Sequence, residues 1–237
     1  MTGSNERIVL VTGAGRGIGR AIAARFLASG DRCVLAVRSD AVRRELEAEL
    51  AGEPQAVVER CDVRDRAQVD ALAARVRARF GRVDVLVNNA AIFECVDYAT
   101  RADELDLDVV RRTLETNVLG TIGVCVAFVP LLPCGSRIVN LSSDLGQLGK
   151  DGGMTATMVA YSLSKAAVNA YTSALANALH DRGIAVDSLH PGWIRTAMGG
   201  PHAPLSVDDG AEAVYALASR EPGPTGRFWI DGRVAPW

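Results

Sequence analysis

The chain has 237 residues, of which 49% are hydrophobic and 23% charged, so it is long enough to bury a complete core within one domain. Its formal net charge of -2 at pH 7 leaves neither acid nor base in excess. This balance argues against nucleic acid or an anionic membrane as the main partner, and we expect a small-molecule partner instead.

The ends and the cysteines of the chain give two further expectations. The first residues lack a basic region followed by an apolar core, and inspection finds no apolar run of bilayer-spanning length, so we expect a cytoplasmic protein. The cysteines and histidines show neither paired nor metal-ligand spacing. We predict reduced core cysteines and no metal site.

Short β-branched runs alternate with longer helical patterns along the whole chain. We expect strands at residues 8–13, 33–38, 56–63, 83–90, 137–143, 184–192 and 227–232. Helical spacing of apolar residues is found at 19–30, 40–50, 66–81, 108–132 and 160–171, and again after Ser206. The alternation predicts an α/β fold, a Rossmann-type doubly wound parallel seven-stranded sheet with helices on both faces, in one domain over 1–237.

Three irregular segments follow predicted strands, at residues 93–103, 144–157 and 194–206. In an open α/β sheet the ligand crevice is built from loops at the carboxyl ends of the strands. We therefore expect these segments to be substrate loops, with residues 199–206, rich in glycine and proline, acting as a mobile lid. For the lid or the loop 144–157, a subunit contact is the alternative.

The stretch "TGAGRGIG", Thr12 to Gly19, comes directly after the first strand and opens the first helix. Glycines at such a turn let the backbone approach a pyrophosphate, and the helix N-terminus supplies free N–H groups. A tight structural turn is the alternative explanation. The position between a strand and an amphipathic helix favours nucleotide binding.

Tyr161 and Lys165 are four residues apart in the stretch "YSLSK". On a helix these positions share one face, so the ammonium can lie near the phenol and favour its ionised form. A free phenol, with a pKa of about 10, is too weak an acid for efficient proton transfer at neutral pH. Taken alone, the pair could equally mean packing and a solvated charge.

Taken together, the motifs along the chain resemble those of the classical short-chain dehydrogenase/reductase family, and most closely its carbonyl-reductase-like members. Besides the glycine motif they are "NNAA" at 88–91, "TNVLG" at 116–120, "IVNLSS" at 138–143, "YSLSK" at 161–165 and "HPGWIRTAM" at 190–198. The order of the motifs matches the family along essentially the whole chain. Two features depart from the family pattern: Ala91 replaces a glycine, and the interval from Ser143 to Tyr161 is a few residues longer.

The resemblance implies a catalytic set of Asn117, Ser143, Tyr161 and Lys165. In this scheme Tyr161 gives its proton to a carbonyl oxygen, Ser143 orients that oxygen, and Asn117 helps to hold a water that links Lys165 to solvent. Alternation along a strand lets only one of Ser142 and Ser143 face the cleft, and the family pattern favours the second.

The resemblance also implies the residues that bind a nicotinamide cofactor. They are Gly13, Arg16, Gly17, Ile18, Gly19, Arg38, Asp62, Val63, Asn89, Ala90, Tyr161, Lys165, Pro191, Gly192, Trp193 and Thr196. For Asp62 and Val63, which follow the third strand and would flank the adenine, a solvated strand end is the alternative.

The second strand bears on the choice between the two nicotinamide cofactors. Val37 occupies the position of the acid that binds the ribose 2′-OH in NAD enzymes, and Arg38 follows it. Arg16 and Arg38 could converge on a 2′-phosphate, which favours NADP(H). In the alternative, both arginines are solvated and Asp40, which we expect to cap the next helix, binds the ribose.

The sequence therefore predicts an oxidoreductase that reduces a ketone or aldehyde with NADPH. Its alternatives are an NAD-dependent alcohol dehydrogenase working in the oxidative direction and a noncatalytic nucleotide sensor. A homo-oligomer is compatible with the sequence, which determines neither the substrate nor the oligomeric state.

Overall fold

The computed structural model describes residues 6–149, 154–221 and 223–237. Eight strands form one sheet in the order β3-β2-β1-β4-β5-β6-β7-β8. They are β1 (Ile8–Thr12), β2 (Arg32–Val37), β3 (Ala56–Arg60), β4 (Val85–Asn88), β5 (Arg137–Leu141), β6 (Ala185–His190), β7 (Phe228–Ile230) and β8 (Arg233–Ala235). All neighbouring pairs are parallel except β7 and β8.

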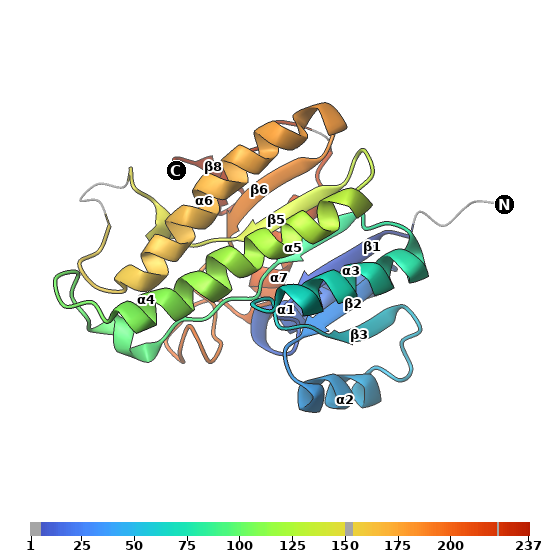
Figure 1. The fold of residues 1–237 in the computed structure, drawn as a ribbon, viewed down its shortest axis with the longest axis horizontal. Helices are drawn as coiled ribbons and strands as arrows, with labels where there is room; N and C mark the ends of the chain where they lie inside the picture. Colours follow the sequence, from blue (N-terminus) through green and yellow to red (C-terminus); the bar gives the residue numbers. More distant parts are fainter. Residues whose placement is uncertain (1–5, 150–153, 222) are drawn as a thin grey trace.

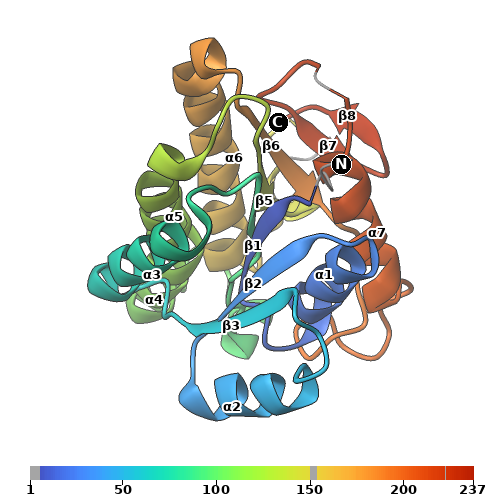
Figure 2. The same cartoon turned by 90° about the vertical axis from the view of Figure 1, so that its right-hand side faces the viewer.

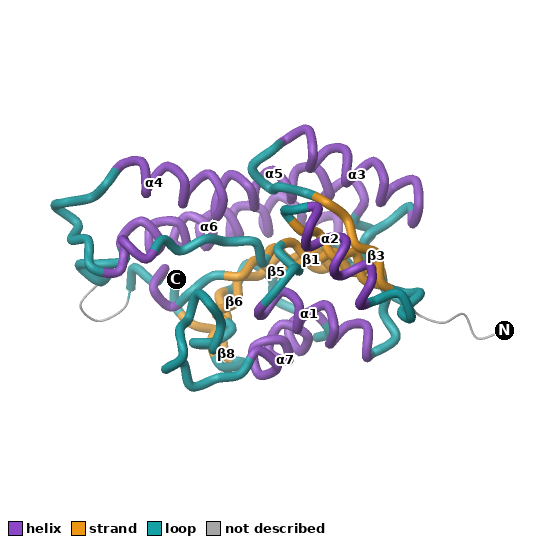
Figure 3. Tube along the Cα trace, turned by 90° about the horizontal axis from the view of Figure 1, so that it is seen from below, coloured by secondary structure: helices purple, strands orange, loops and turns teal. Residues whose placement is uncertain are grey.

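Helices cover both faces of the sheet, as the sequence predicts (Figures 1 and 2). The helices are α1 (Gly17–Ala28), α2 (Asp40–Glu49), α3 (Arg66–Phe80), α4 (Leu107–Leu114), α5 (Thr121–Phe128), α6 (Val159–Leu179) and α7 (Val207–Ala218). Helices α3 to α6 lie on one face and α1 with α7 on the other, so that the sheet forms the middle layer (Figure 3). Each face has its own apolar core, built around Phe128 on the first and Phe26 on the second.

The strand order reverses between β1 and β4, which are hydrogen-bonded neighbours. The chain leaves β1 toward one edge of the sheet and returns at β4 toward the other. At such a switch point the loops that follow the two strands separate and leave a crevice at their carboxyl ends. The glycine turn after β1 and the "NNAA" segment after β4 border this crevice.

The sheet has one strand more than predicted. Strand β8 returns antiparallel to β7 through a two-residue turn at Asp231 and Gly232, whose φ angles are 48° and 73°. Two successive positive φ values are typical of the type I′ hairpin turn, for which Asp-Gly is a preferred sequence. The signal for the eighth strand was therefore present in "IDGRVA", but the three-residue strand was too short to stand out.

The helix expected over 108–132 is interrupted in its middle. Residues Glu115–Gly120 form a π-helical segment between α4 and α5. By length and composition alone, the continuous run Leu107–Leu131 could cross a bilayer, which corrects the expectation that no segment is long enough. The run packs against α3 and α6, while Leu119 and Val126 are exposed.

Two local expectations are wrong. Cys95 and Cys134 are exposed, whereas the other three cysteines are buried core residues as predicted. The cap of α2 is Ser39, whose side chain accepts a hydrogen bond from the Val42 N–H, and Asp40 is the first helical residue. Serine and aspartate are both good N-cap residues, so the sequence "RSDAV" does not show whether Ser39 or Asp40 caps the helix.

A buried ion pair joins the neighbouring strands β5 and β6. Nη1 of Arg137 lies 2.8 Å from Oδ2 of Asp187, whose side chain is fully buried. Burial raises the pKa of the Asp187 carboxyl and lowers the pKa of the Arg137 guanidinium. Because desolvation opposes both charges, each partner depends on the other to remain ionised in the core.

We predict that Arg137→Met destabilises the protein by about 3–5 kcal/mol, because it leaves the Asp187 charge buried without its partner. The free energy of unfolding in urea would measure the loss. Arg66→Ala is the control, since it removes an exposed pair with Asp70 and should change stability by less than about 0.5 kcal/mol. A loss below about 1 kcal/mol in the first variant would contradict this prediction.

Candidate active site

The glycine turn between β1 and α1 has the conformation that close approach of a phosphate requires. Gly13 and Gly17 have φ angles of 65° and 55°, which L-residues with a side chain rarely adopt. A Cβ atom on Gly19 would lie 2.3 Å from Nδ2 of Asn89. At these three glycines no side chain covers the backbone near the N-terminus of α1, an arrangement that fits a pyrophosphate.

Side chains from β1 and β4 hold this turn in place. Oγ1 of Thr12 accepts hydrogen bonds from the N–H groups of Asn89 and Ala90, at 3.0 and 3.1 Å. Nδ2 of Asn89 donates to the carbonyl oxygens of Thr12 and Gly13. Asn89 therefore braces the turn from the neighbouring strand. Thr12 takes part in these hydrogen bonds, but the sequence did not indicate it as a site residue. Only the pairing of β1 with β4 brings it close to Asn89 and Ala90.

Ala91 replaces the glycine that is usual in the family. Among the described residues only Met158 and Asp231 combine a side chain with a positive φ, so Ala91 has an ordinary backbone conformation. The substitution does not strain the segment that follows β4.

Two exposed guanidinium groups lie at the ends of the adjoining loops. Arg16 is the residue before α1 and Arg38 follows β2 directly. Within the described part of the chain neither forms an ion pair within 4 Å. In contrast, Asp40 forms ion pairs with Arg43 and Arg60, at 3.2 and 3.6 Å. The carboxylate that could bind a ribose is thus engaged, and the two cations are available.

Asp62 and Val63 follow β3 on the same side of the sheet. The Asp62 carboxylate forms an ion pair with Arg64 at 2.7 Å, and this contact lowers the pKa of Asp62. Val63 packs closely on Gly120, where an added Cβ would meet its side chain at 2.8 Å. Their contact with an adenine ring stays a prediction.

Lys165 and Tyr161 lie in the first turns of α6, facing the carboxyl end of β5. Nζ of Lys165 donates a hydrogen bond to the Leu141 carbonyl oxygen at 2.8 Å and lies 5.4 Å from the Tyr161 ring centroid. Burial lowers the pKa of Lys165 to about 8. Burial, with a smaller effect of the Asp144 charge, raises the pKa of Tyr161.

These shifts correct the electrostatic expectation for the phenol. The sequence predicted that the ammonium lowers the pKa of the phenol, but here the cost of removing charge from water dominates both groups. The phenol is accordingly protonated at neutral pH. That is the form of Tyr161 from which a proton can be given to a substrate.

The two serines at the end of β5 have different partners. Oγ of Ser142 donates to the Lys165 carbonyl oxygen at 3.3 Å, so this hydroxyl is turned toward the α6 backbone. Oγ of Ser143 contacts the Asp144 carboxylate at 3.2 Å and accepts a bond from the Leu145 N–H. The different partners favour Ser143 as the serine that serves the cleft.

Asn117 lies in the π-helical segment and joins the loop after β4 to α6. Its Oδ1 accepts from the Ile92 N–H at 2.8 Å, and its Nδ2 donates to the Ile92 carbonyl and to Oγ of Ser164. Both ends of the side-chain amide are hydrogen-bonded to protein groups, and these bonds brace the region. The contact with a water near Lys165 stays a prediction.

The segment 194–206 lies over the glycine turn. An added Cβ on Gly17 would meet Cγ2 of Thr196 at 3.3 Å, which puts these two predicted cofactor residues side by side. The base of the segment is closed by a bridge between Ile194 and Leu205, and α7 starts after Ser206 with a capping box.

Other predicted residues lie along the same edge. Gly192 has a φ of 96°, and Nε1 of the half-exposed Trp193 donates to the Gly199 carbonyl. Pro191 precedes them, and Ile18 is close to Gly210 of α7. The predicted loop 144–157 is described only up to residue 149 and from residue 154, and residues 150–153 lie outside the described part.

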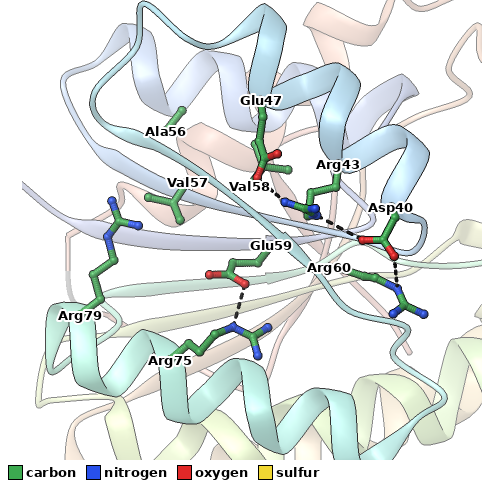
Figure 4. A pocket seen from close by; sticks show the side chains of 10 residues that line it. All are labelled: Asp40, Arg43, Glu47, Ala56, Val57, Val58, Glu59, Arg60, Arg75 and Arg79. Carbon is green, nitrogen blue, oxygen red and sulfur yellow. Dashed lines mark hydrogen bonds and ion pairs between the residues drawn. The ribbon is translucent and has the colours of Figure 1, made fainter.

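A concavity of about 500 Å³ lies elsewhere, along the free edge of β3 between α2 and α3 (Figure 4). Most of its charged residues form ion pairs, with Arg43 between Asp40 and Glu47 and Arg75 paired with Glu59. None of the predicted catalytic residues lines it. This edge of the sheet is therefore separate from the candidate active site.

The family model for the short chain dehydrogenase matches residues 7–204. The chain is 37% identical to L-fucose dehydrogenase of Oryctolagus cuniculus, over 85% of this chain and 68% of the relative. It is 31% identical to carbonyl reductase [NADPH] 1 of Sus scrofa, over 99% and 95% of the two chains. A solved structure of NADPH-bound carbonyl reductase from chicken fatty liver has a TM-score of 0.86 at 29% identity, covering 99% of this chain and all of the other.

We predict that Lys165→Met raises the stability of the cofactor-free protein at pH 7 by on the order of 1–3 kcal/mol. The shift of the Lys165 pKa from 10.5 to about 8 is a penalty of roughly 3 kcal/mol, reduced in the variant by the lost bond to Leu141.

The pH dependence of this stability gain follows from the protonation of Lys165 in the folded and unfolded states. Below pH 8 both states hold the proton and the full penalty applies, whereas between pH 8 and 10.5 the folded state releases it first and the penalty fades. Urea unfolding of both proteins from pH 7 to 10 would check this. A variant that is less stable at pH 7, or an advantage independent of pH, would contradict it.

Proposed function

The chain belongs to the short-chain dehydrogenase family, and we propose on that premise that it reduces a ketone or aldehyde carbonyl to an alcohol with NADPH. The observation that carries the proposal is the half-buried Tyr161 phenol, one helical turn from Lys165, whose Nζ lies 5.4 Å from the phenol ring centroid. An acid beside a cation that can stabilise its conjugate base is suited to giving a proton to a carbonyl oxygen.

The cofactor supplies the hydride when it is bound. The bare backbone of Gly13, Gly17 and Gly19 would hold its pyrophosphate at the α1 N-terminus, with Thr196 beside the turn. Arg16 and Arg38 would bind a 2′-phosphate through charge-assisted hydrogen bonds. The absence of an acid at Val37 and the engagement of Asp40 with Arg43 and Arg60 support NADP(H) over NAD(H).

The protein side chains would then manage the proton and the substrate. Ser143 would donate a hydrogen bond to the substrate oxygen and orient it toward the phenol. Tyr161 would transfer its proton to that oxygen, and Lys165, charged up to a pH of about 8, would stabilise the phenolate that remains. Asn117 would hold the loop after β4 in a fixed position against α6 for this transfer.

A second candidate is oxidation of an alcohol, which the relative named L-fucose dehydrogenase supports. It would use the same residues with the proton moving in the opposite direction. For either reaction we propose a small-molecule substrate and a cytoplasmic enzyme. A homo-oligomer stays a prediction.

We predict that Tyr161→Phe abolishes turnover while the nucleotide still binds. The ring and its packing remain, but the proton donor is lost, and general acid catalysis typically contributes about 100- to 10,000-fold. Steady-state kinetics over a panel of carbonyl compounds and NADPH titration by fluorescence would measure the two effects. Tyr171→Phe removes a hydroxyl from the same helix and should keep most of the activity; a Tyr161 variant near the wild-type rate would refute the assignment.

We predict that Arg38→Ala raises the KM for NADPH roughly 10- to 100-fold and leaves that for NADH nearly unchanged, because one charge-assisted bond is lost. The exposed Arg44 of α2 provides the control variant, Arg44→Ala, which should change neither constant. If the wild-type kcat/KM with NADH equals or exceeds that with NADPH, the NAD-linked alcohol dehydrogenase becomes the better proposal.

A further inference from the structure

The helix that carries Tyr161 and Lys165 begins without a cap of its own. The residue before α6 is Met158, which has a φ of 58° and provides no side-chain hydrogen bond to the first turn. The first N–H groups of a helix have no partner within it, so an acceptor must come from elsewhere when they are buried. Ala160 is fully buried, and its N–H therefore needs such an acceptor.

The acceptor is Asp97, from the short 3-10 turn Cys95–Tyr98 in the predicted substrate loop 93–103. Its Oδ1 accepts from the Ala160 N–H at 3.2 Å and its Oδ2 from the Tyr161 N–H at 3.0 Å. Its carbonyl oxygen accepts from the Met158 N–H at 2.9 Å. Only 2% of Asp97 is exposed, so these bonds are shielded from water.

The same loop also contacts the ring of Tyr161. The Phe93 ring packs edge-to-face on the Tyr161 ring at 5.4 Å and on the Tyr98 ring at 5.5 Å. On its other side, Glu94 forms a double hydrogen bond with Arg112 of α4, with both distances 2.7 Å. The loop is thus anchored to α4 and holds Tyr161 at its backbone and at its ring.

We propose that Asp97 is a positioning residue for Tyr161, which fixes the phenol for proton transfer by capping α6 from the substrate loop. This inference rests on the proposed reductase function. A carboxylate suits the task because its two oxygens serve two N–H groups and its charge is favourable at the positive end of a helix. Movement of the loop when a substrate enters would be transmitted directly to the first turn of α6.

The test compares Asp97→Ala, Asp97→Asn and Asp103→Ala. Asp103 is the control, because it is exposed in the same loop and its ion-pair partner, Arg101, is exposed as well. Hydrogen exchange of the amides of 158–163 reports the cap without any substrate. The kcat, the KM for NADPH and the solvent deuterium isotope effect on kcat report the position of the proton donor.

We expect Asp97→Ala to lower kcat about 10- to 100-fold, since small misplacements of a reacting group have effects of this size. The KM for NADPH should stay within about twofold, the isotope effect should increase as proton transfer becomes slower, and the amides of 160 and 161 should exchange faster. Asp97→Asn, which keeps one acceptor, should lie between Asp97→Ala and the wild type, and it serves as the test if Asp97→Ala does not fold. Asp103→Ala should match the wild type.

A lower melting temperature with unchanged kcat and isotope effect would overturn the proposal and leave Asp97 as a structural cap. Unchanged amide exchange would overturn it as well. A wild-type protein without activity in either direction would refute the proposed function instead, while the exchange measurement would still decide whether Asp97 caps α6.

Discussion

The burial of the Lys165 ammonium against the Leu141 carbonyl oxygen is the contact on which the arrangement of the candidate active site depends. It links α6 to the carboxyl end of β5, which is followed directly by the candidate serines Ser142 and Ser143. The fit is tight, because a Cβ on Gly146 would come within 2.8 Å of the Lys165 carbonyl carbon. The serine loop can approach the helix this closely only with a glycine there.

A chain of buried hydrogen bonds keeps α6 from rotating or sliding on the sheet. Asn88 of β4 donates to Asn140 of β5, which donates to Thr172 of α6, and Ser188 of β6 donates to the same hydroxyl, all at 2.8 Å. Polar groups in a core are costly unless each finds its partner, so the network strongly favours one register of the helix. Lys165 and Thr172 are two helical turns apart on α6, so one position of the helix on the sheet satisfies the hydrogen bonds of both side chains.

The two ends of the site are supported in different ways. At the nucleotide end the backbone itself forms the surface, braced by Thr12 and Asn89 from adjoining strands. At the end that holds Tyr161, side chains of the loop 93–103 contact this residue, with Phe93 at its ring and Asp97 at its backbone. Glycines would suffice at the first end because a phosphate would bind to N–H groups, whereas the proposed proton transfer would need a held side chain.

The sequence by itself determined the features that depend on neighbouring residues. Alternation of apolar runs predicted the parallel sheet and its helices, the glycine spacing predicted the turn after β1, and four-residue spacing put Tyr161 and Lys165 on one helical face. Only the tertiary structure decided the cap from Asp97, the tie at Thr12 and the direction of the pKa shifts. These depend on contacts between residues tens of positions apart and on exclusion of water, neither of which a local pattern of residues records.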